Sequence, residues 1–79
     1  MSSLLRLPIV MERTGLSRAS VYLHVAKGVL TKPVKIGERS AAWPESDVDA
    51  INAARIAGKS EVEIQMLVER LHSQRQAAH

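Results

Sequence analysis

The side chains that could do chemistry in this chain are mostly cationic, and they are concentrated in its first half. The 79 residues carry a net charge of +3. Residues 1–42 hold seven lysines and arginines against two acids, a balance of +5, whereas residues 43–79 hold four against six, a balance of −2. A basic half of this kind is typical of a surface that faces phosphate groups.

The sequence offers little support for catalysis or for metal binding. The three histidines lack the spacing of metal ligands, and the absence of cysteine excludes a disulfide framework and a thiolate zinc site. No Ser, His and Asp set is expected to assemble in so small a core. The acids Glu45, Asp47 and Asp49 are interpreted as charges at the start of a helix. We therefore expect no enzyme activity, no cofactor and no small-molecule ligand.

The sequence also argues against a membrane protein, a secreted protein and a protein that binds single-stranded nucleic acid. No apolar run approaches the roughly 20 residues of a membrane span, and Met1–Val10 lacks the layout of a signal peptide. Together with the lack of cysteine this favours a cytoplasmic protein without membrane contact. The aromatic residues are Tyr22 and Trp43, too few for a platform that stacks single-stranded bases.

The stretch Thr14–Tyr22 predicts the turn and second helix of a helix-turn-helix. Gly15 can take the positive φ that ends one helix, and Leu16 is an apolar plug between two crossing helices. Ser17 is a good N-cap, and Val21 gives the new helix an inward face. A helix presented over such a turn commonly enters a DNA major groove.

Helices and a hairpin are expected around this motif. The first helix is predicted over Pro8–Arg13, with Ile9, Val10 and Met11 inward, after a loose start over Met1–Arg6 that includes a short extended piece. The second runs from Arg18 to about Lys27 and stops at Gly28. Val29–Pro33 is a connector. Val34–Trp43 predicts a hairpin that turns at Gly37–Glu38, and its buried face is expected to consist of Val34, Ile36, Ala41 and Trp43, with Trp43 in the core.

Two further helices complete the expected fold. Pro44 opens the third, in which Val48, Ile51 and Ala54 or Arg55 fall at helical spacing, and Gly58 ends it. Ser60 and Glu63 form a capping box for the fourth, which is predicted over Glu61–Gln74, with fraying over Gln76–His79. The fourth helix carries an apolar stripe of Ile64, Leu67, Val68 and Leu71 and, opposite it, Val62 and Met66. Because a helix apolar on two faces is normally covered on both, we expect a homodimer through this helix.

Taken together, these segments resemble the AlpA family of phage-type transcriptional regulators, relatives of the excisionases and MerR-type winged helix-turn-helix domains. The resemblance rests on Arg13–Arg18, Val21–Tyr22, Lys32–Arg39, Trp43 and Ser46–Ala50. The resemblance covers Leu7–Ala57 and implies a winged helix-turn-helix, which we assign to residues 1–58. With the helix predicted above added as a C-terminal unit over residues 59–79, the expected fold is mainly α with a small β-hairpin. The resemblance also implies sequence-specific binding to double-stranded DNA, with the second helix in the major groove and the hairpin as a wing.

The second helix departs from the family pattern. Members usually carry Arg and then an apolar residue after the Tyr, whereas this chain has Leu23 and then His24. With Val21 inward, steps of 100° turn Ala19, Leu23 and Ala26 outward. The face toward the bases is therefore more apolar than in the family pattern. His24 falls on the inner flank and is interpreted as a packed or backbone-bonded imidazole.

The residues expected to contact DNA lie on the second helix and the hairpin: Arg18, Ala19, Ser20, Tyr22, Leu23, Lys27, Lys35 and Arg39. At the hairpin tip, Arg39 is expected to enter a narrow minor groove, with Lys35 on a phosphate. Two interpretations stay open for several of the others. Tyr22 donates its hydroxyl to a phosphate or is a half-buried ring, and Ser20 contacts DNA or serves the helix cap. Leu23 meets a thymine methyl group or packs against protein.

Two alternatives to a transcriptional regulator stay open. One is an excisionase-like protein that bends DNA at a recombination site, and it would use the same residues. The other is a protein-interaction adaptor that uses Leu23 and the C-terminal helix without binding DNA. The sequence does not identify the operator, the regulated genes or the sign of regulation.

Overall fold

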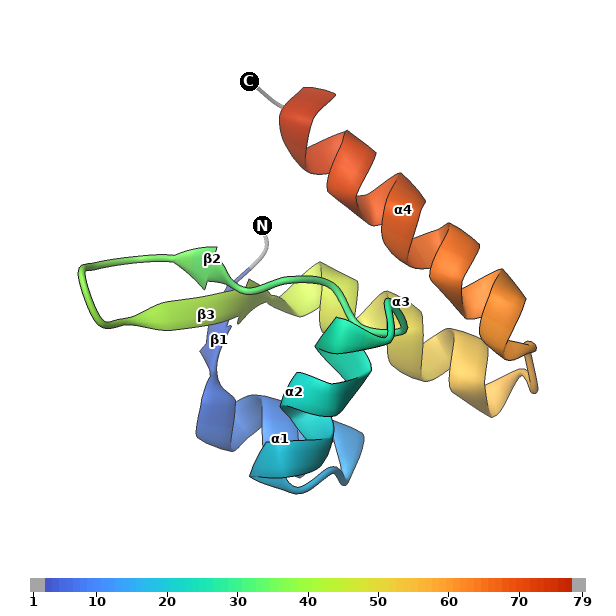
Figure 1. The fold of residues 1–79 in the computed structure, drawn as a ribbon, viewed down its shortest axis with the longest axis horizontal. Coiled ribbons are helices and arrows are strands. Elements are labelled where there is room, and N and C mark those ends of the chain that lie inside the picture. Colours follow the sequence, from blue (N-terminus) through green and yellow to red (C-terminus); the bar gives the residue numbers. More distant parts are fainter. Residues whose placement is uncertain (1–2, 78–79) are drawn as a thin grey trace.

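The chain folds into helices arranged around a small sheet (Figure 1). The computed structural model describes residues 3–77, with side chains described through Arg75. In chain order the elements are β1 (Leu4–Arg6), α1 (Leu7–Thr14), α2 (Arg18–Ala26), β2 (Val34–Lys35), β3 (Ala41–Pro44), α3 (Glu45–Ile56) and α4 (Glu61–Ala77). The strands form one antiparallel sheet in the order β1-β3-β2. This confirms the mainly α fold with a hairpin and an additional C-terminal helix.

The arrangement separates the hairpin from the last helix. In Figure 1, α1 and α2 lie together below the sheet, the β2–β3 hairpin projects to the left, and α4 packs along α3 at the right. Helix α4 continues to Ala77, three residues beyond the predicted end at Gln74. The predicted helix end is therefore three residues short, and the expected fraying over Gln76–His79 stays a prediction; residues 78–79 lie outside the described part of the chain.

The turn between α1 and α2 confirms the expected helix-turn-helix. Gly15 adopts φ 73°, in the left-handed region, and its N–H donates to the Met11 carbonyl at 2.9 Å. The side chain of Ser17 accepts a hydrogen bond from the Ser20 N–H at 3.2 Å and so caps α2. Leu16 is half-buried and packs against the core between the two helices.

The short extended piece expected near the chain start is strand β1, Leu4–Arg6. β1 pairs with β3, so that Leu5 lies opposite Trp43 and Arg6 opposite Ala42. Leu5 is buried as a result. A three-residue strand carries too little alternation to be recognised in a sequence, but it satisfies backbone groups that β3 would otherwise leave unpaired.

The hairpin differs from the predicted pattern of burial. Ile36 is 44% exposed because β2 ends at Lys35, and Ala41 is only half-buried. In β3 the adjacent residues Ala42 and Trp43 are both buried. The reason is that β3 is the central strand and lies against α1 and α3, so side chains on both of its faces are covered.

The core is centred on Trp43 and on the segment after α2. Trp43 is 1% exposed, and its Nε1–H donates to the Thr31 carbonyl at 2.8 Å, as a buried indole requires. Val29, Leu30 and Thr31 are also buried, so the expected connector is in part core. In α1, Val10 is fully buried as predicted, but Ile9 is 40% exposed.

Helices α3 and α4 close the same core. Val48 and Ile51 of α3 are buried, as are Ile64 and Val68 of the predicted stripe on α4. The capping box at the start of α4 is confirmed, since the Ser60 N–H donates to Glu63 Oε1 and the Glu63 N–H to Ser60 Oγ, both at 3.2 Å.

Candidate nucleic-acid interface

Helix α2 presents an exposed face opposite its buried side chain. Val21 is fully buried, whereas Ala19, Leu23 and Ala26 are exposed, as the helical geometry predicts. The exposed fraction of Leu23 is 56%. The outer face of α2 is therefore small and largely apolar, and Arg18 at its first position supplies charge.

The surroundings of Tyr22 and Ser20 are compatible both with a DNA contact and with the structural roles considered above, a half-buried ring for Tyr22 and a helix cap for Ser20. The Tyr22 ring lies 6.4 Å from the Trp43 ring at an interplanar angle of 56°, yet Tyr22 is 49% exposed. It is thus a ring that packs on one side and faces solvent on the other. The Ser20 hydroxyl accepts a hydrogen bond from the Ser17 hydroxyl at 3.0 Å and so takes part in the cap of α2.

The hairpin forms an exposed projection beside α2. Its end is closed by a hydrogen bond from the Ile36 N–H to the Ser40 carbonyl at 2.9 Å. Lys35 and Arg39 are exposed, and Arg39 lies within the bend at the tip. The hairpin therefore carries charge away from the body of the molecule.

A cleft of about 310 Å³ separates the hairpin from α2. Its wall contains Arg18 and Tyr22 from α2, Arg39 from the hairpin, and Arg6 from β1. The cleft is completed by apolar and aromatic residues, namely Leu7, Pro8, Ala41 and Trp43. Three of the predicted contact residues thus come together with a third arginine, whereas Ala19, Ser20, Leu23, Lys27 and Lys35 do not line this cleft.

The arginines of the cleft lack protein partners. Among the described residues, Arg13 pairs with Glu45 and Asp49, Arg75 pairs with Asp47, and Arg55 bonds His24. Arg6, Arg18 and Arg39 make no salt bridge and no side-chain hydrogen bond within that part of the chain, and neither does Arg70 on α4. Guanidinium groups without internal partners remain available to anionic ligands such as phosphates.

The residues that form this cleft lie within a segment that matches a known family. Residues 3–56 match the family described as prophage CP4-57 regulatory protein (AlpA). The chain belongs to the AlpA family. It is also 44% identical over 55 residues to an uncharacterized protein, ORF88, of Enterobacteria phage P4, in a match that spans 70% of this chain and 62% of that protein's length. No solved structure matches the chain.

Membership of the AlpA family places the chain among phage regulatory proteins. The match includes α1, α2, the sheet and α3, and it ends before α4. The cleft is therefore formed within the family segment, and α4 lies outside it.

Arg6 is the cleft residue that the sequence did not single out. In the sequence it falls in the expected loose start, where only its charge points to a role. Pairing of β1 with β3 places Arg6 opposite Ala42, at the base of the hairpin. The strand thus brings a basic side chain from the chain start to the same cleft as Arg18 and Arg39.

Lys27 lies toward α4 and away from the cleft. Its Nζ lies 4.0 Å from Glu61 Oε1, and its carbonyl accepts a hydrogen bond from Gln65 Nε2 at 3.1 Å. Both partners belong to α4. Lys27 therefore has a closer connection to the C-terminal helix than to the hairpin.

The histidines with described side chains have structural partners. His24 is half-buried, as expected for a packed imidazole, and its Nδ1 accepts from Arg55 Nη2 at 2.9 Å rather than from the backbone. Burial, followed by the Arg55 charge, lowers the pKa of His24. Burial, followed by the Arg75 charge, also lowers the pKa of His72. Across residues 3–75 no group of three His, Cys, Asp or Glu side chains is arranged to hold a metal ion. No helix in the described part of the chain has the length and apolar character needed to cross a membrane.

Proposed function

We propose that this AlpA-family protein is a transcriptional regulator of a phage or mobile element that binds double-stranded DNA sequence-specifically. The observation that supports this best is the cleft between α2 and the hairpin, where three arginines without partners meet. Neighbouring guanidinium groups without internal partners create a positive potential that attracts polyanions, and the duplex backbone is such a ligand.

In this proposal α2 enters the major groove. Arg18 at the start of the helix contacts a base edge or a phosphate, and Ser20 contributes a hydroxyl. Ala19 and Leu23 meet apolar base edges, above all the thymine methyl group, which only the major groove displays. The half-exposed Tyr22 donates its hydroxyl to a phosphate.

The hairpin acts as a wing at the adjacent minor groove. Arg39 at the tip enters the groove, where a narrow A·T-rich segment has an enhanced negative potential, and Lys35 contacts a phosphate. Arg6 lies in the cleft between the two contacts and binds the backbone between them. Lys27, at the other end of α2, contacts a flanking phosphate.

The same proposal treats residues 1–58 as the DNA-binding unit and residues 59–79 as a helix that caps the core and pairs two copies. The outer face of α4 exposes two apolar side chains, Val62 at 63% and Met66 at 59%. The same helix of a second copy could cover both, which supports a homodimer. Sedimentation of wild type and Met66→Glu tests this: the variant should be a folded monomer.

Selection of bound sequences from a random duplex pool, followed by binding titrations at several salt concentrations, tests the function. We expect one enriched sequence and an affinity that falls steeply with salt. Binding without sequence enrichment would leave only a nonspecific or DNA-bending role. No binding to any duplex would favour the protein-interaction adaptor.

A further inference from the structure

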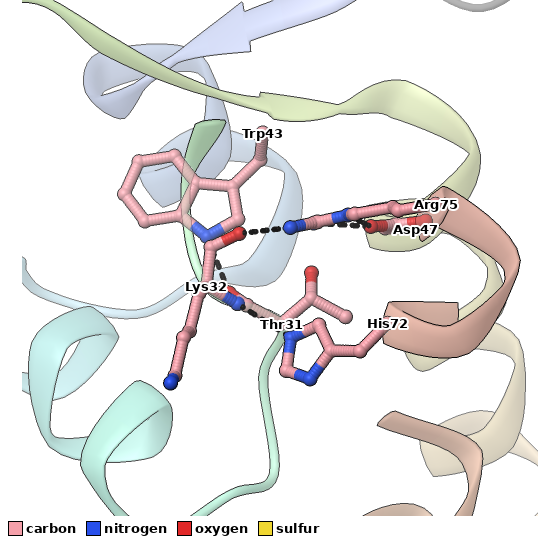
Figure 2. Close-up of polar contacts among 6 residues, drawn as sticks. All are labelled: Thr31, Lys32, Trp43, Asp47, His72 and Arg75. Carbon is pink, nitrogen blue, oxygen red and sulfur yellow. Dashed lines mark hydrogen bonds and ion pairs between the residues drawn. The ribbon is translucent and has the colours of Figure 1, made fainter. Parts of the chain in front are cut away.

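Helix α4 holds the segment that leads into the wing (Figure 2). Lys32 precedes β2 by two residues, and both of its backbone polar groups are bonded by α4. Its N–H donates to Nε2 of His72 at 3.1 Å, and its carbonyl accepts from Nη1 of Arg75 at 2.7 Å. Figure 2 shows the Lys32 side chain pointing away from both, so the contact depends on the backbone.

Arg75 is itself fixed by α3. Its Nε and Nη2 both donate to Oδ2 of Asp47, at 3.2 and 2.5 Å, and Asp47 is only 5% exposed. A planar guanidinium with three of its nitrogens engaged has little freedom to move. Arg75 therefore joins α4, α3 and the segment before the wing into one unit.

The opposite side of this segment is held by the sheet. The Thr31 carbonyl accepts the indole N–H of Trp43 from β3. The backbone at Thr31–Lys32 is thus bonded from β3 on one side and from α4 on the other (Figure 2). Because β2 has only two residues, the direction of the hairpin depends strongly on how this preceding segment is held.

We propose that His72 and Arg75 are positioning residues for DNA binding: α4 sets the orientation of the wing, and with it the place of Arg39, through the backbone of Lys32. This inference rests on the proposed function, because it assumes that the wing contacts DNA. It assigns a role to the helix that lies outside the segment matched by the AlpA family.

A double-mutant cycle measured by DNA titration tests this role. Arg75→Ala should weaken binding of the selected duplex about tenfold, whereas Arg70→Ala, which removes the same charge from the same helix, should change it less than about twofold. In the Arg75→Ala background, Arg39→Ala should have little further effect while Arg18→Ala keeps its full effect. Additive effects of Arg75→Ala and Arg39→Ala would overturn the proposal.

Two His72 variants cover the case in which Arg75→Ala does not fold. His72→Ala removes only the acceptor for the Lys32 N–H and should weaken DNA binding in the same wing-dependent way. His72→Gln restores an acceptor oxygen and should recover most of the affinity. Equal affinities of wild type and His72→Ala would contradict a positioning role for His72.

Amide hydrogen exchange separates the positioning role from the proposed function itself. In Arg75→Ala and His72→Ala, the Ile36 amide in the hairpin should exchange about tenfold faster than in wild type, while the Val21 amide in α2 stays protected. Unchanged exchange at Ile36 would refute the positioning role. If wild type binds no duplex, the proposed function fails, and the Ile36 result still decides whether α4 orders the hairpin.

Discussion

Two regions of the molecule use arginine in opposite ways: the cleft between α2 and the hairpin, and the contact between α4 and the Lys32 backbone. In the cleft, Arg6, Arg18 and Arg39 converge without protein partners. At the other end of the hairpin, Arg75 bonds a buried carboxylate and a backbone carbonyl. A satisfied guanidinium stabilises structure, whereas an unsatisfied one is available to a ligand. The comparison therefore predicts that substitution of Arg75 lowers stability and, through the wing, also weakens binding. Substitution of the cleft arginines should weaken binding and leave stability unchanged.

The largest expected effect is on the structural side, at Trp43. Trp43→Ala should lower the free energy of unfolding by about 3–5 kcal/mol, because it removes a buried indole, and a domain of this size has little more to lose. Urea denaturation followed by circular dichroism measures it. Trp43→Phe, which keeps most of the volume but loses the bond to Thr31, should cost less. A Trp43→Ala protein that kept normal stability and lost only DNA binding would show that Trp43 is a DNA contact and not a core residue.

Arg75→Ala should have the next largest effect on stability. It leaves the carboxylate of Asp47 buried without its partner, which we expect to cost about 1–3 kcal/mol, less than for a fully buried pair because Arg75 is a quarter exposed. Adding Asp47→Asn removes the unpaired charge and should recover part of the loss. Arg70→Ala, the matched control, should stay within about 0.5 kcal/mol of wild type. Equal stabilities of Arg75→Ala and Arg70→Ala would show that the buried pair contributes nothing.

On the binding side, Arg39→Ala should leave the unfolding free energy within about 0.5 kcal/mol of wild type, since Arg39 is exposed. It should weaken DNA binding and reduce the dependence of log Kd on log salt by about one unit. Titrations at several salt concentrations test this. Wild-type affinity at every salt concentration would remove Arg39 from the interface.

The smallest expected effect concerns pH. The pKa values of His24 and His72 are lowered in the folded protein, so as the pH falls below about 6.5 the unfolded chain takes up protons before the folded one. The free energy of unfolding should therefore be at its full value above that pH and decline below it. His72→Gln should make the decline shallower. Stability that rose between neutral and mildly acidic pH would contradict the neutral, hydrogen-bonded state of both rings.

Local signals explain why much of the fold could be predicted from sequence. Gly15 and Ser17 specify the turn through a left-handed φ and a side-chain cap, and both act within four residues of their partners. Ser60 and Glu63 specify the start of α4 through reciprocal hydrogen bonds between residues only three positions apart. The apolar spacing on α4 identifies its buried stripe because helical periodicity is a local property.

Contacts between distant residues could not be predicted in this way. Arg75 meets Asp47 across 28 positions, and His72 meets Lys32 across 40. Neither pair has a motif, and the position of Asp47 in the first turn of α3 indicates only a helix-start charge. Arg6 was missed for the same reason, because only the pairing of β1 with β3 brings it to the cleft. Arg18, Tyr22 and Arg39 of the candidate site thus follow from local sequence, whereas the position of Arg6 depends on tertiary structure.

The central claim is that the three unpaired arginines of the cleft bind duplex DNA. The most direct test compares the salt dependence of DNA affinity for wild type, the Arg6→Ala/Arg18→Ala/Arg39→Ala triple variant, and Arg70→Ala. We predict that the slope of log Kd against log salt falls by about two to three units in the triple variant and stays unchanged in Arg70→Ala, with both proteins as stable as wild type. A triple variant that kept the wild-type slope and affinity would contradict the account.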